Sequence, residues 1–354
     1  MTFTRRSAYE RIRLLEFDWE GADVNLSDNT NRWGAHPAAL AVLRAAGERS
    51  LYEYPTPYGE RLEAAVARRF GVPVEWVATG CGSDDVLDCA LRALGGPGRR
   101  LVFVPPTFSM VVSLALANGL EPVAVERSGA FPGAAALLAE RPHLVYLCRP
   151  ENPTGELLPR AVVEELLAVP DGPVVLLDEA YAEFAGESLL SLAGQGSRLV
   201  VLRTMSKAYG LAGLRVGYAV GDPSLVREIE KARGPFKVGR LAEEAAVAAL
   251  ESSDDWLARS LGEARENRER LAVRLRELGL QPLPSAANFL LVPVEGSARV
   301  LAGALRERGI AVRAFAGLPG IGDAIRVTVA PWPQLERFLV VLEKVLHKRA
   351  GGGR

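Results

Sequence analysis

One lysine lies in a segment whose residues suit covalent chemistry on a carbonyl group. The segment R-T-M-S-K-A-Y-G follows an apolar run and sets Lys207 among small hydroxyl residues. Only five of the 42 basic residues are lysines, so arginine supplies most of the positive charge. Lysine forms an imine with an aldehyde and arginine does not, and burial lowers the pKa of an amine toward the free base that imine formation needs. Lys207 is therefore the candidate nucleophile, with an ordinary loop lysine as the alternative.

A carboxylate stands at the end of a second apolar run. The motif D-E-A-Y follows residues 174–177 directly and begins with Asp178. A carboxylate at the end of a buried strand is costly unless it is paired. A protonated pyridinium nitrogen suits it as a partner, because the ion pair keeps such a ring an electron sink. The alternative is an aspartate that caps the turn after the strand.

Several residues suit a phosphate group. The loop T-G-C-G-S-D-D at residues 79–85 precedes an expected helix, so its glycines allow a close approach and the helix start offers free N–H groups. It is neither a Walker A loop nor a complete G-x-G-x-x-G pattern, and a plain helix-capping turn is the alternative. Thr204, Ser206 and Arg215 can add hydroxyl and guanidinium contacts to the same phosphate.

A rigid turn follows another apolar run. In R-P-E-N-P-T-G at residues 149–155, two prolines and a glycine define the chain direction. Such a turn aims Asn152 well enough to hydrogen-bond a ring hydroxyl. The alternative is an ordinary Asn-Pro turn.

These motifs need a scaffold that brings strand ends together. Short runs rich in Val and Leu, each flanked by Pro, Gly or charge, predict buried strands. Residues 214–220 are a candidate for a further strand, which would run antiparallel. Alternation of such runs with helical patterns predicts an α/β domain whose mostly parallel sheet lies between helices and binds ligands beyond its carboxyl ends. The predicted strands are 101–104, 144–147, 174–177 and 199–202, and the predicted helices are 83–94, 108–118 and 160–169.

The pattern changes in the last third of the chain. A long charged helical stretch is predicted from about 242 to 278. Two strands, 289–292 and 325–329, and two helices, 299–308 and 334–348, follow it. This order predicts a smaller α+β domain.

Composition excludes several classes of protein. A net charge of −1 without a basic region argues against a nucleic-acid or acidic-membrane partner, and no apolar run reaches the roughly 18 residues of a membrane helix. The three cysteines and three histidines are scattered without metal-ligand spacing. The N-terminus is charged and lacks an apolar signal core. We therefore expect a cytoplasmic protein that binds small molecules and no metal.

Taken together, the motifs resemble those of fold-type I aminotransferases that depend on pyridoxal 5'-phosphate (PLP), in classes I and II, and most of all the histidinol-phosphate aminotransferases. The resemblance runs from about Asn25 to Glu343. It implies a large cofactor-binding domain at 36–250 and a small domain made of 1–35 and 251–354. The motifs that carry it are T-G-C-G-S-D-D, P-P-T-F, N-P-T-G, D-E-A-Y and S-K-A-Y-G-L-A-G-L-R-V-G.

The resemblance also implies a role for each cofactor residue. Lys207 carries PLP as a Schiff base and moves a proton between substrate and cofactor, Asp178 pairs with the ring nitrogen, and Phe108 stacks on the ring. Tyr181 and Asn152 bind the ring hydroxyl. The residues that hold the phosphate are Gly82, Ser83, Thr204, Ser206 and Arg215, and Tyr54 reaches the phosphate in the other subunit of a homodimer.

The substrate end departs from the family pattern. Arg326 resembles the arginine that holds the substrate carboxylate, which accepts a bidentate guanidinium; the alternative is a surface arginine on a strand. Arg313 is a weaker candidate for a distal phosphate, with a solvated arginine as the alternative. Asn29, in L-S-D-N-T-N, stands where the family has an N-E-N-P-like segment and is assigned to the substrate, while no substrate tyrosine is clear in residues 9–19.

The resemblance implies a ping-pong transamination between the pair glutamate and 2-oxoglutarate and a second amine, for which histidinol phosphate is the first choice. There are two alternatives. One is an aminotransferase of aromatic or other amino acids, and the other is an enzyme similar to threonine-phosphate decarboxylase. The sequence leaves the identity of the amine open.

Overall fold

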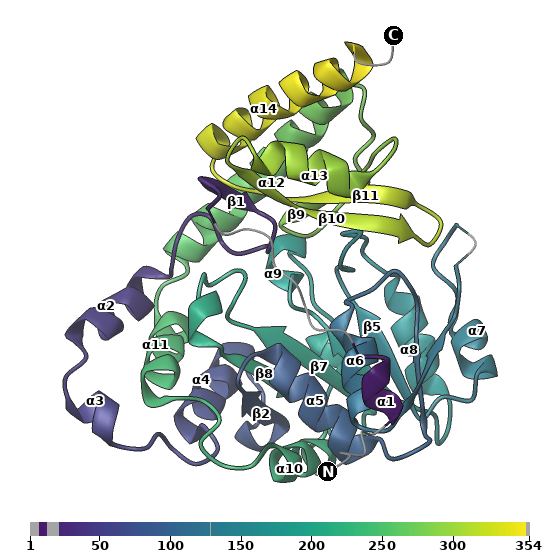
Figure 1. Ribbon diagram of the computed structural model, residues 1–354. Coiled ribbons are helices and arrows are strands. Elements are labelled where there is room, and N and C mark those ends of the chain that lie inside the picture. The colour runs from purple at the N-terminus through teal and green to yellow at the C-terminus, as the bar shows by residue number, and fades with distance from the viewer. Residues whose placement is uncertain (1–6, 13–20, 128, 352–354) are drawn as a thin grey trace, which may run out of the picture.

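The computed structural model describes residues 7–12, 21–127 and 129–351. Their strands form two sheets, one of seven strands and one of four. Figure 1 shows the seven-stranded sheet and its helices in the lower part of the molecule, which we call the larger lobe. The four-stranded sheet and its helices lie above it and form the smaller lobe (Figure 1).

The larger lobe is built on a mostly parallel sheet with the strand order β2-β8-β7-β6-β5-β3-β4. Only β8 runs antiparallel, to both β2 and β7. The predicted α/β class is thereby confirmed, and so is an antiparallel strand near residue 220. The strands are β2 (Val77–Gly80), β3 (Arg100–Phe103), β4 (Glu121–Ala124), β5 (Leu144–Cys148), β6 (Val174–Asp178), β7 (Leu199–Thr204) and β8 (Gly217–Val220).

Helices cover both faces of this sheet, because both faces are apolar. Neighbouring residues of β6 lie in different core clusters: Leu176 packs with Leu87 and Leu91 on one face, and Val175 packs with Leu166 on the other. The helices are α2 (Pro37–Ala45), α3 (Arg49–Tyr52), α4 (Glu60–Phe70), α5 (Ser83–Leu94), α6 (Met110–Ala117), α7 (Ala134–Ala139), α8 (Arg160–Ala168), α9 (Ala182–Ala185), α10 (Pro223–Arg233) and α11 (Arg240–Glu251).

The smaller lobe combines segments from both ends of the chain. Its sheet has the order β1-β10-β11-β9, with β1 parallel to β10 and the other pairs antiparallel. Helix α12 joins the lobes, because Leu261 lies in the core of the larger lobe and Leu275 in that of the smaller. The elements are β1 (Val24–Leu26), α12 (Asp255–Glu277), β9 (Phe289–Pro293), α13 (Ala298–Arg306), β10 (Ile310–Leu318), β11 (Gly322–Thr328) and α14 (Trp332–Gly351).

Two predictions about the last third of the chain are wrong. The predicted helix from 242 to 278 is two helices, α11 and α12, which the polar residues at 252–254 separate; such side chains compete with the helix for backbone hydrogen bonds. The smaller lobe has four strands and not two. The two strands that were not predicted are β10, whose burial declines along its length, and the three-residue β1. The domain boundaries at 36 and 250 stay a prediction.

Helix α14 offers a test of the smaller core. Phe338 is 0% exposed among the strands' side chains, and Val340 on the same helix is 46% exposed. We expect Phe338→Ala to lower the free energy of unfolding by about 3–5 kcal/mol, since it leaves a cavity. We expect Val340→Ala to change it by less than about 0.5 kcal/mol. Urea unfolding followed by circular dichroism measures both, and equal effects would contradict this packing.

Candidate active site

The candidate residues of the larger lobe gather at one edge of its sheet. Asp178 is the last residue of β6 and lies opposite Leu202 of the neighbouring parallel strand β7. Lys207 follows the end of β7 by three residues, and Asn152 follows the end of β5 by four. Because the carboxyl ends of parallel strands meet at the same edge, the fold brings three motifs together.

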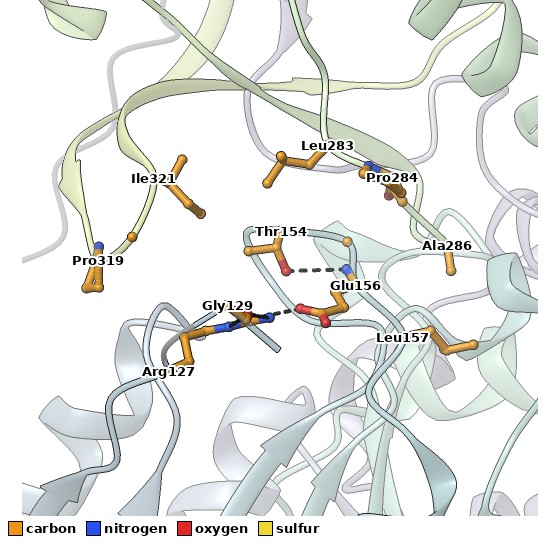
Figure 2. A pocket seen from close by; sticks show the side chains of 13 residues that line it. Arg127, Gly129, Thr154, Glu156, Leu157, Leu283, Pro284, Ala286, Pro319 and Ile321 are labelled. Carbon is orange, nitrogen blue, oxygen red and sulfur yellow. Dashed lines mark hydrogen bonds and ion pairs between the residues drawn. The ribbon is translucent and has the colours of Figure 1, made fainter. Parts of the chain in front are cut away.

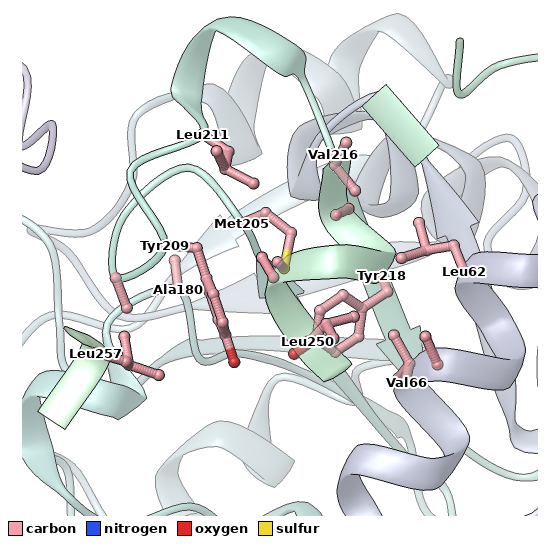
Figure 3. Close-up of a cluster of buried hydrophobic side chains, with 14 of the residues drawn as sticks. Leu62, Val66, Ala180, Met205, Tyr209, Leu211, Val216, Tyr218, Leu250 and Leu257 are labelled. Carbon is pink, nitrogen blue, oxygen red and sulfur yellow. The ribbon is translucent and has the colours of Figure 1, made fainter. Parts of the chain in front are cut away.

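Core packing anchors the segment that carries Lys207. Met205 and Tyr209, on either side of it, are buried in the cluster drawn in Figure 3, with Val216 and Tyr218 among their neighbours. Packing in the core of the larger lobe therefore holds the backbone around Lys207. The side chain extends toward Asp28, in the segment that follows β1.

Lys207 is half-buried, and its amine is held against protein groups. Its Nζ donates a hydrogen bond of 2.9 Å to the carbonyl oxygen of Asp28 and lies 5.9 Å from the centre of the Tyr181 ring. Burial, with a smaller contribution from the positive charge of Arg326, lowers the pKa of Lys207 to about 8. The amine therefore loses its proton more readily than an ordinary lysine, as imine formation requires.

The carboxyl group of Asp178 is buried and hydrogen-bonded. Oδ2 accepts a 2.8 Å bond from the Tyr146 hydroxyl, and Oδ1 accepts a 3.0 Å bond from the backbone N–H of Ala180. Burial is the main cause that raises the pKa of Asp178 to about 6; the two hydrogen bonds oppose the rise, and the nearby Asp84 contributes to it. A cationic ring nitrogen beside this group would favour its ionised form, so the residue fits the partner that the sequence predicts for it.

The predicted phosphate residues meet at the start of α5. Gly82 has φ 88°, and a Cβ there would lie 2.5 Å from Nη2 of Arg215, so the guanidinium rests on the glycine. Arg215 donates a 3.4 Å hydrogen bond to Ser206, whose backbone N–H donates to the Thr204 hydroxyl at 3.1 Å. A twelve-residue helix begins here at Ser83 without a side-chain cap. Free helical N–H groups, hydroxyls and a guanidinium together fit a phosphate.

Arg326 on β11 reaches from the smaller lobe to the turn of the larger one. Its Nη1 donates to Oδ1 of Asn152 at 2.6 Å, and its Nη2 donates to the carbonyl oxygen of Ser27 at 2.7 Å. Its buried Nε has no hydrogen-bond partner among the described residues. Burial lowers the pKa of Arg326 to about 10. A buried guanidinium with a remaining donor fits a carboxylate ligand.

Asn29 lies in the same region, and both polar atoms of its side chain bond protein groups. Its Nδ2 donates to the Tyr181 hydroxyl at 3.0 Å, and its Oδ1 accepts from the Thr328 hydroxyl at 3.2 Å. These bonds orient Tyr181, whose pKa is raised by burial. The assignment of Asn29 to the substrate stays a prediction, because its hydrogen bonds are with other side chains of the protein.

The remaining predicted residues are placed less directly. Phe108 packs, partly buried, against the core at the start of α6. Arg313 stands opposite Arg326 in the β10–β11 register, and burial lowers its pKa. Tyr54 is 76% exposed, and its ring lies 4.8 Å from that of Phe236, centre to centre. The assigned roles of all three stay predictions, and most of residues 9–19 lies outside the described part of the chain.

Three residues of the site were not predicted from the sequence. Tyr146 donates to Asp178, Glu151 accepts from the backbone N–H of Asn152, and the hydroxyl of Thr328 bonds Asn29. A hydroxyl inside the apolar run 144–148 and an acid inside a proline turn were the available signals.

A cavity of about 570 Å³ lies between the lobes and is lined by residues 154–157, which follow Asn152 in the chain. The ion pair of Arg127 and Glu156, at 2.6 Å, borders it from the larger lobe, and Leu283 and Ile321 border it from the smaller (Figure 2). None of the predicted cofactor residues lines it.

Within the described residues, no helix combines the length and apolar character needed to cross a membrane.

Comparison with known proteins supplies a family. The histidinol-phosphate aminotransferase of Roseiflexus castenholzii is 41% identical over 336 residues, which cover 91% of this chain and 89% of that protein. Histidinol-phosphate aminotransferase 2 of Rhizobium meliloti is 36% identical over 327 residues, with 91% and 93% coverage.

Solved structures agree in fold. The crystal structure of histidinol-phosphate aminotransferase from Sinorhizobium meliloti in complex with pyridoxal-5'-phosphate has a TM-score of 0.85 and 26% identity, and the match covers 98% of this chain and 99% of that one. L-threonine-O-3-phosphate decarboxylase from Porphyromonas gingivalis has a TM-score of 0.81 at 24% identity, covering 92% and 99%. The family model for aminotransferase class I and II matches residues 22–342. The chain therefore belongs to the aminotransferase class I and II family.

Proposed function

We propose that this protein is a PLP-dependent histidinol-phosphate aminotransferase, which exchanges an amino group between histidinol phosphate and the pair glutamate and 2-oxoglutarate. The observation that carries the proposal is the gathering of a desolvated lysine, a buried aspartate and a phosphate-type cradle at one sheet edge. Relatives with this name, 33–41% identical over about nine-tenths of the chain, support the substrate.

The residues of the larger lobe fit the cofactor. Lys207 would hold it covalently, Asp178 would face its ring nitrogen, and the start of α5 with Arg215 would hold its phosphate. Tyr181 and Asn152 would bind the ring hydroxyl. When bound, PLP supplies an electron sink for the carbanion that forms when the substrate Cα loses a proton.

The chain's own groups bind the substrate and move the proton. Arg326 holds the α-carboxylate of glutamate through its donors beside Asn152, and in histidinol phosphate, which has no carboxylate, it meets the phosphate instead. Arg313, its cross-strand neighbour, attracts the distal phosphate. The amine of Lys207 takes the proton from the substrate carbon as general base and returns it as general acid. Asp178 remains ionised while it faces a cation.

A homodimer in the cytoplasm completes the proposal. Four large apolar side chains are exposed near α3 and α11, and such a patch favours a protein interface. Tyr54 would then reach the partner's cofactor phosphate. The patch consists of Leu51, Tyr52, Tyr54 and Phe236, which are 43–76% exposed.

Replacement of the nucleophile tests the chemistry. Lys207→Arg keeps the positive charge but removes the amine that can join an aldehyde. We expect the absorbance band of bound PLP near the visible edge to shift or vanish, and turnover to fall by about 10²–10⁴-fold. The control is Lys231→Arg, because Lys231 is exposed and paired with Glu228 on α10. Unchanged turnover in Lys207→Arg would refute the assignment.

The lowered pKa of Lys207 predicts how cofactor capture depends on pH. Only the neutral amine reacts, and its fraction rises with pH until the pKa is passed. Capture of PLP by the apoprotein should therefore accelerate by about tenfold per pH unit below about 8 and level off above it. Stopped-flow absorbance measures the rate. A rise that continued unchanged to pH 10 would show an ordinary lysine.

Arg326 tests the substrate site. Arg326→Lys keeps the charge but loses the fork that bonds Asn152 and Ser27. We expect kcat/KM for glutamate to fall by about 10–100-fold, as for the loss of one charge-assisted hydrogen bond. Arg337→Lys, at an exposed arginine paired with Asp23, should change it little.

Product analysis separates the proposal from a decarboxylase. With histidinol phosphate and 2-oxoglutarate, transamination forms glutamate. An enzyme like L-threonine-O-3-phosphate decarboxylase, whose structure has the same fold, would instead release carbon dioxide from phosphothreonine. Release of carbon dioxide from phosphothreonine, with no glutamate formed from histidinol phosphate and 2-oxoglutarate, would overturn the proposal.

A further inference from the structure

A buried carboxyl group connects two loops of the active site. Glu151 precedes Asn152 in the turn, and its Oε1 accepts two hydrogen bonds. One, of 2.7 Å, comes from the hydroxyl of Thr107, and the other, of 2.9 Å, comes from the backbone N–H of Asn152. Thr107 directly precedes Phe108 in the chain, so one oxygen atom joins the loop that bears Phe108 to the turn that bears Asn152.

The turn itself holds Glu151 in place. Its backbone N–H donates to the carbonyl oxygen of Glu156 at 2.7 Å, and its carbonyl oxygen accepts from the N–H of Gly155 at 2.7 Å. The side chain is therefore directed inward by a closed turn. Glu151 is 3% exposed, and no cationic group of residues 7–12, 21–127 and 129–351 forms an ion pair with it. Such burial is uncommon for an acid that is not paired with a cation.

The connection continues to the substrate side. Asn152 uses its backbone N–H to bond Glu151 and its side-chain Oδ1 to accept from Arg326. The array thus runs from the Phe108 loop through Glu151 and Asn152 to the guanidinium on β11.

We propose that Glu151 is a positioning residue: it orients Arg326 through Asn152 and orients the Phe108 loop through Thr107. The inference rests on the proposed function, since it assigns the cofactor ring to Phe108 and the substrate to Arg326. It adds a residue that touches neither ligand and acts through two that do.

Burial favours the neutral form of this carboxyl group. Burial, more than any other cause, raises the pKa of Glu151 well above its usual range, although the bonds from Thr107 and Asn152 oppose the shift. A neutral carboxyl group and a glutamine amide both present one carbonyl oxygen to the two donors. Glutamine should therefore replace the glutamate, whereas leucine has the size without the acceptor and leaves both donors unpaired.

The experiment compares Glu151→Gln with Glu151→Leu in the PLP-loaded enzyme. For Glu151→Leu we expect the KM for glutamate to rise about tenfold, with a smaller change in kcat, as for the loss of one hydrogen bond. The visible circular dichroism of the cofactor, which reports the setting of its ring, should also change. Glu151→Gln should stay within about twofold of the wild type in KM and keep its dichroism.

A second variant separates the two arms and serves if Glu151→Leu does not fold. Thr107→Val removes one donor with little change of shape, so it should alter the visible dichroism while KM changes by less than about threefold. Glu165→Leu, at an exposed acid on α8, is the matched control and should alter neither.

Two results would overturn the inference alone. One is a wild-type KM and dichroism in Glu151→Leu or, where that variant does not fold, wild-type dichroism in Thr107→Val. The other is a Glu151→Gln variant as impaired as Glu151→Leu, because then the charge and not the acceptor matters. A wild-type protein with no cofactor band would instead remove the proposed function and this inference with it.

Discussion

Desolvation of the Lys207 amine is the constraint on which the rest of the site depends. A lysine on a solvated loop holds its proton at neutral pH, whereas burial lowers the pKa of this one to about 8. The larger lobe sustains the burial because Met205 and Tyr209 fix the backbone on both sides of it in the core. The segment after β1 covers it from the other side, where Asp28 offers a carbonyl oxygen. Reactivity here is therefore a consequence of packing.

The charges around this amine are arranged by the architecture of the sheet. Asp178 ends one strand and the Lys207 segment follows its neighbour, so a carboxylate and an amine share an edge. Helix α5 begins beside the same edge, and Arg215 rests on Gly82 where no side chain intervenes. A parallel sheet concentrates such groups without any long loop, since all its carboxyl ends point one way.

The substrate side depends on contact between the two lobes. Arg326 belongs to β11 of the smaller lobe, yet it bonds Asn152 of the larger lobe and Ser27 from the start of the chain. Three distant segments thus define one guanidinium position. Glu151 extends the same hydrogen-bonded array to the Phe108 loop. A movement of the smaller lobe would therefore shift both Arg326 and the Asn152 turn to which it is bonded.

The sequence by itself determined the residue types of the site and most strands of the larger sheet, because apolar runs and motifs such as D-E-A-Y are local patterns. It did not reveal β1, β4 or β10, which are short, half-exposed or mixed in burial. Only the tertiary structure decided that Tyr146 supports Asp178, 32 residues away, or that Asn29 meets Thr328 across 299 residues. Such pairings depend on how whole elements pack, and no local pattern encodes them.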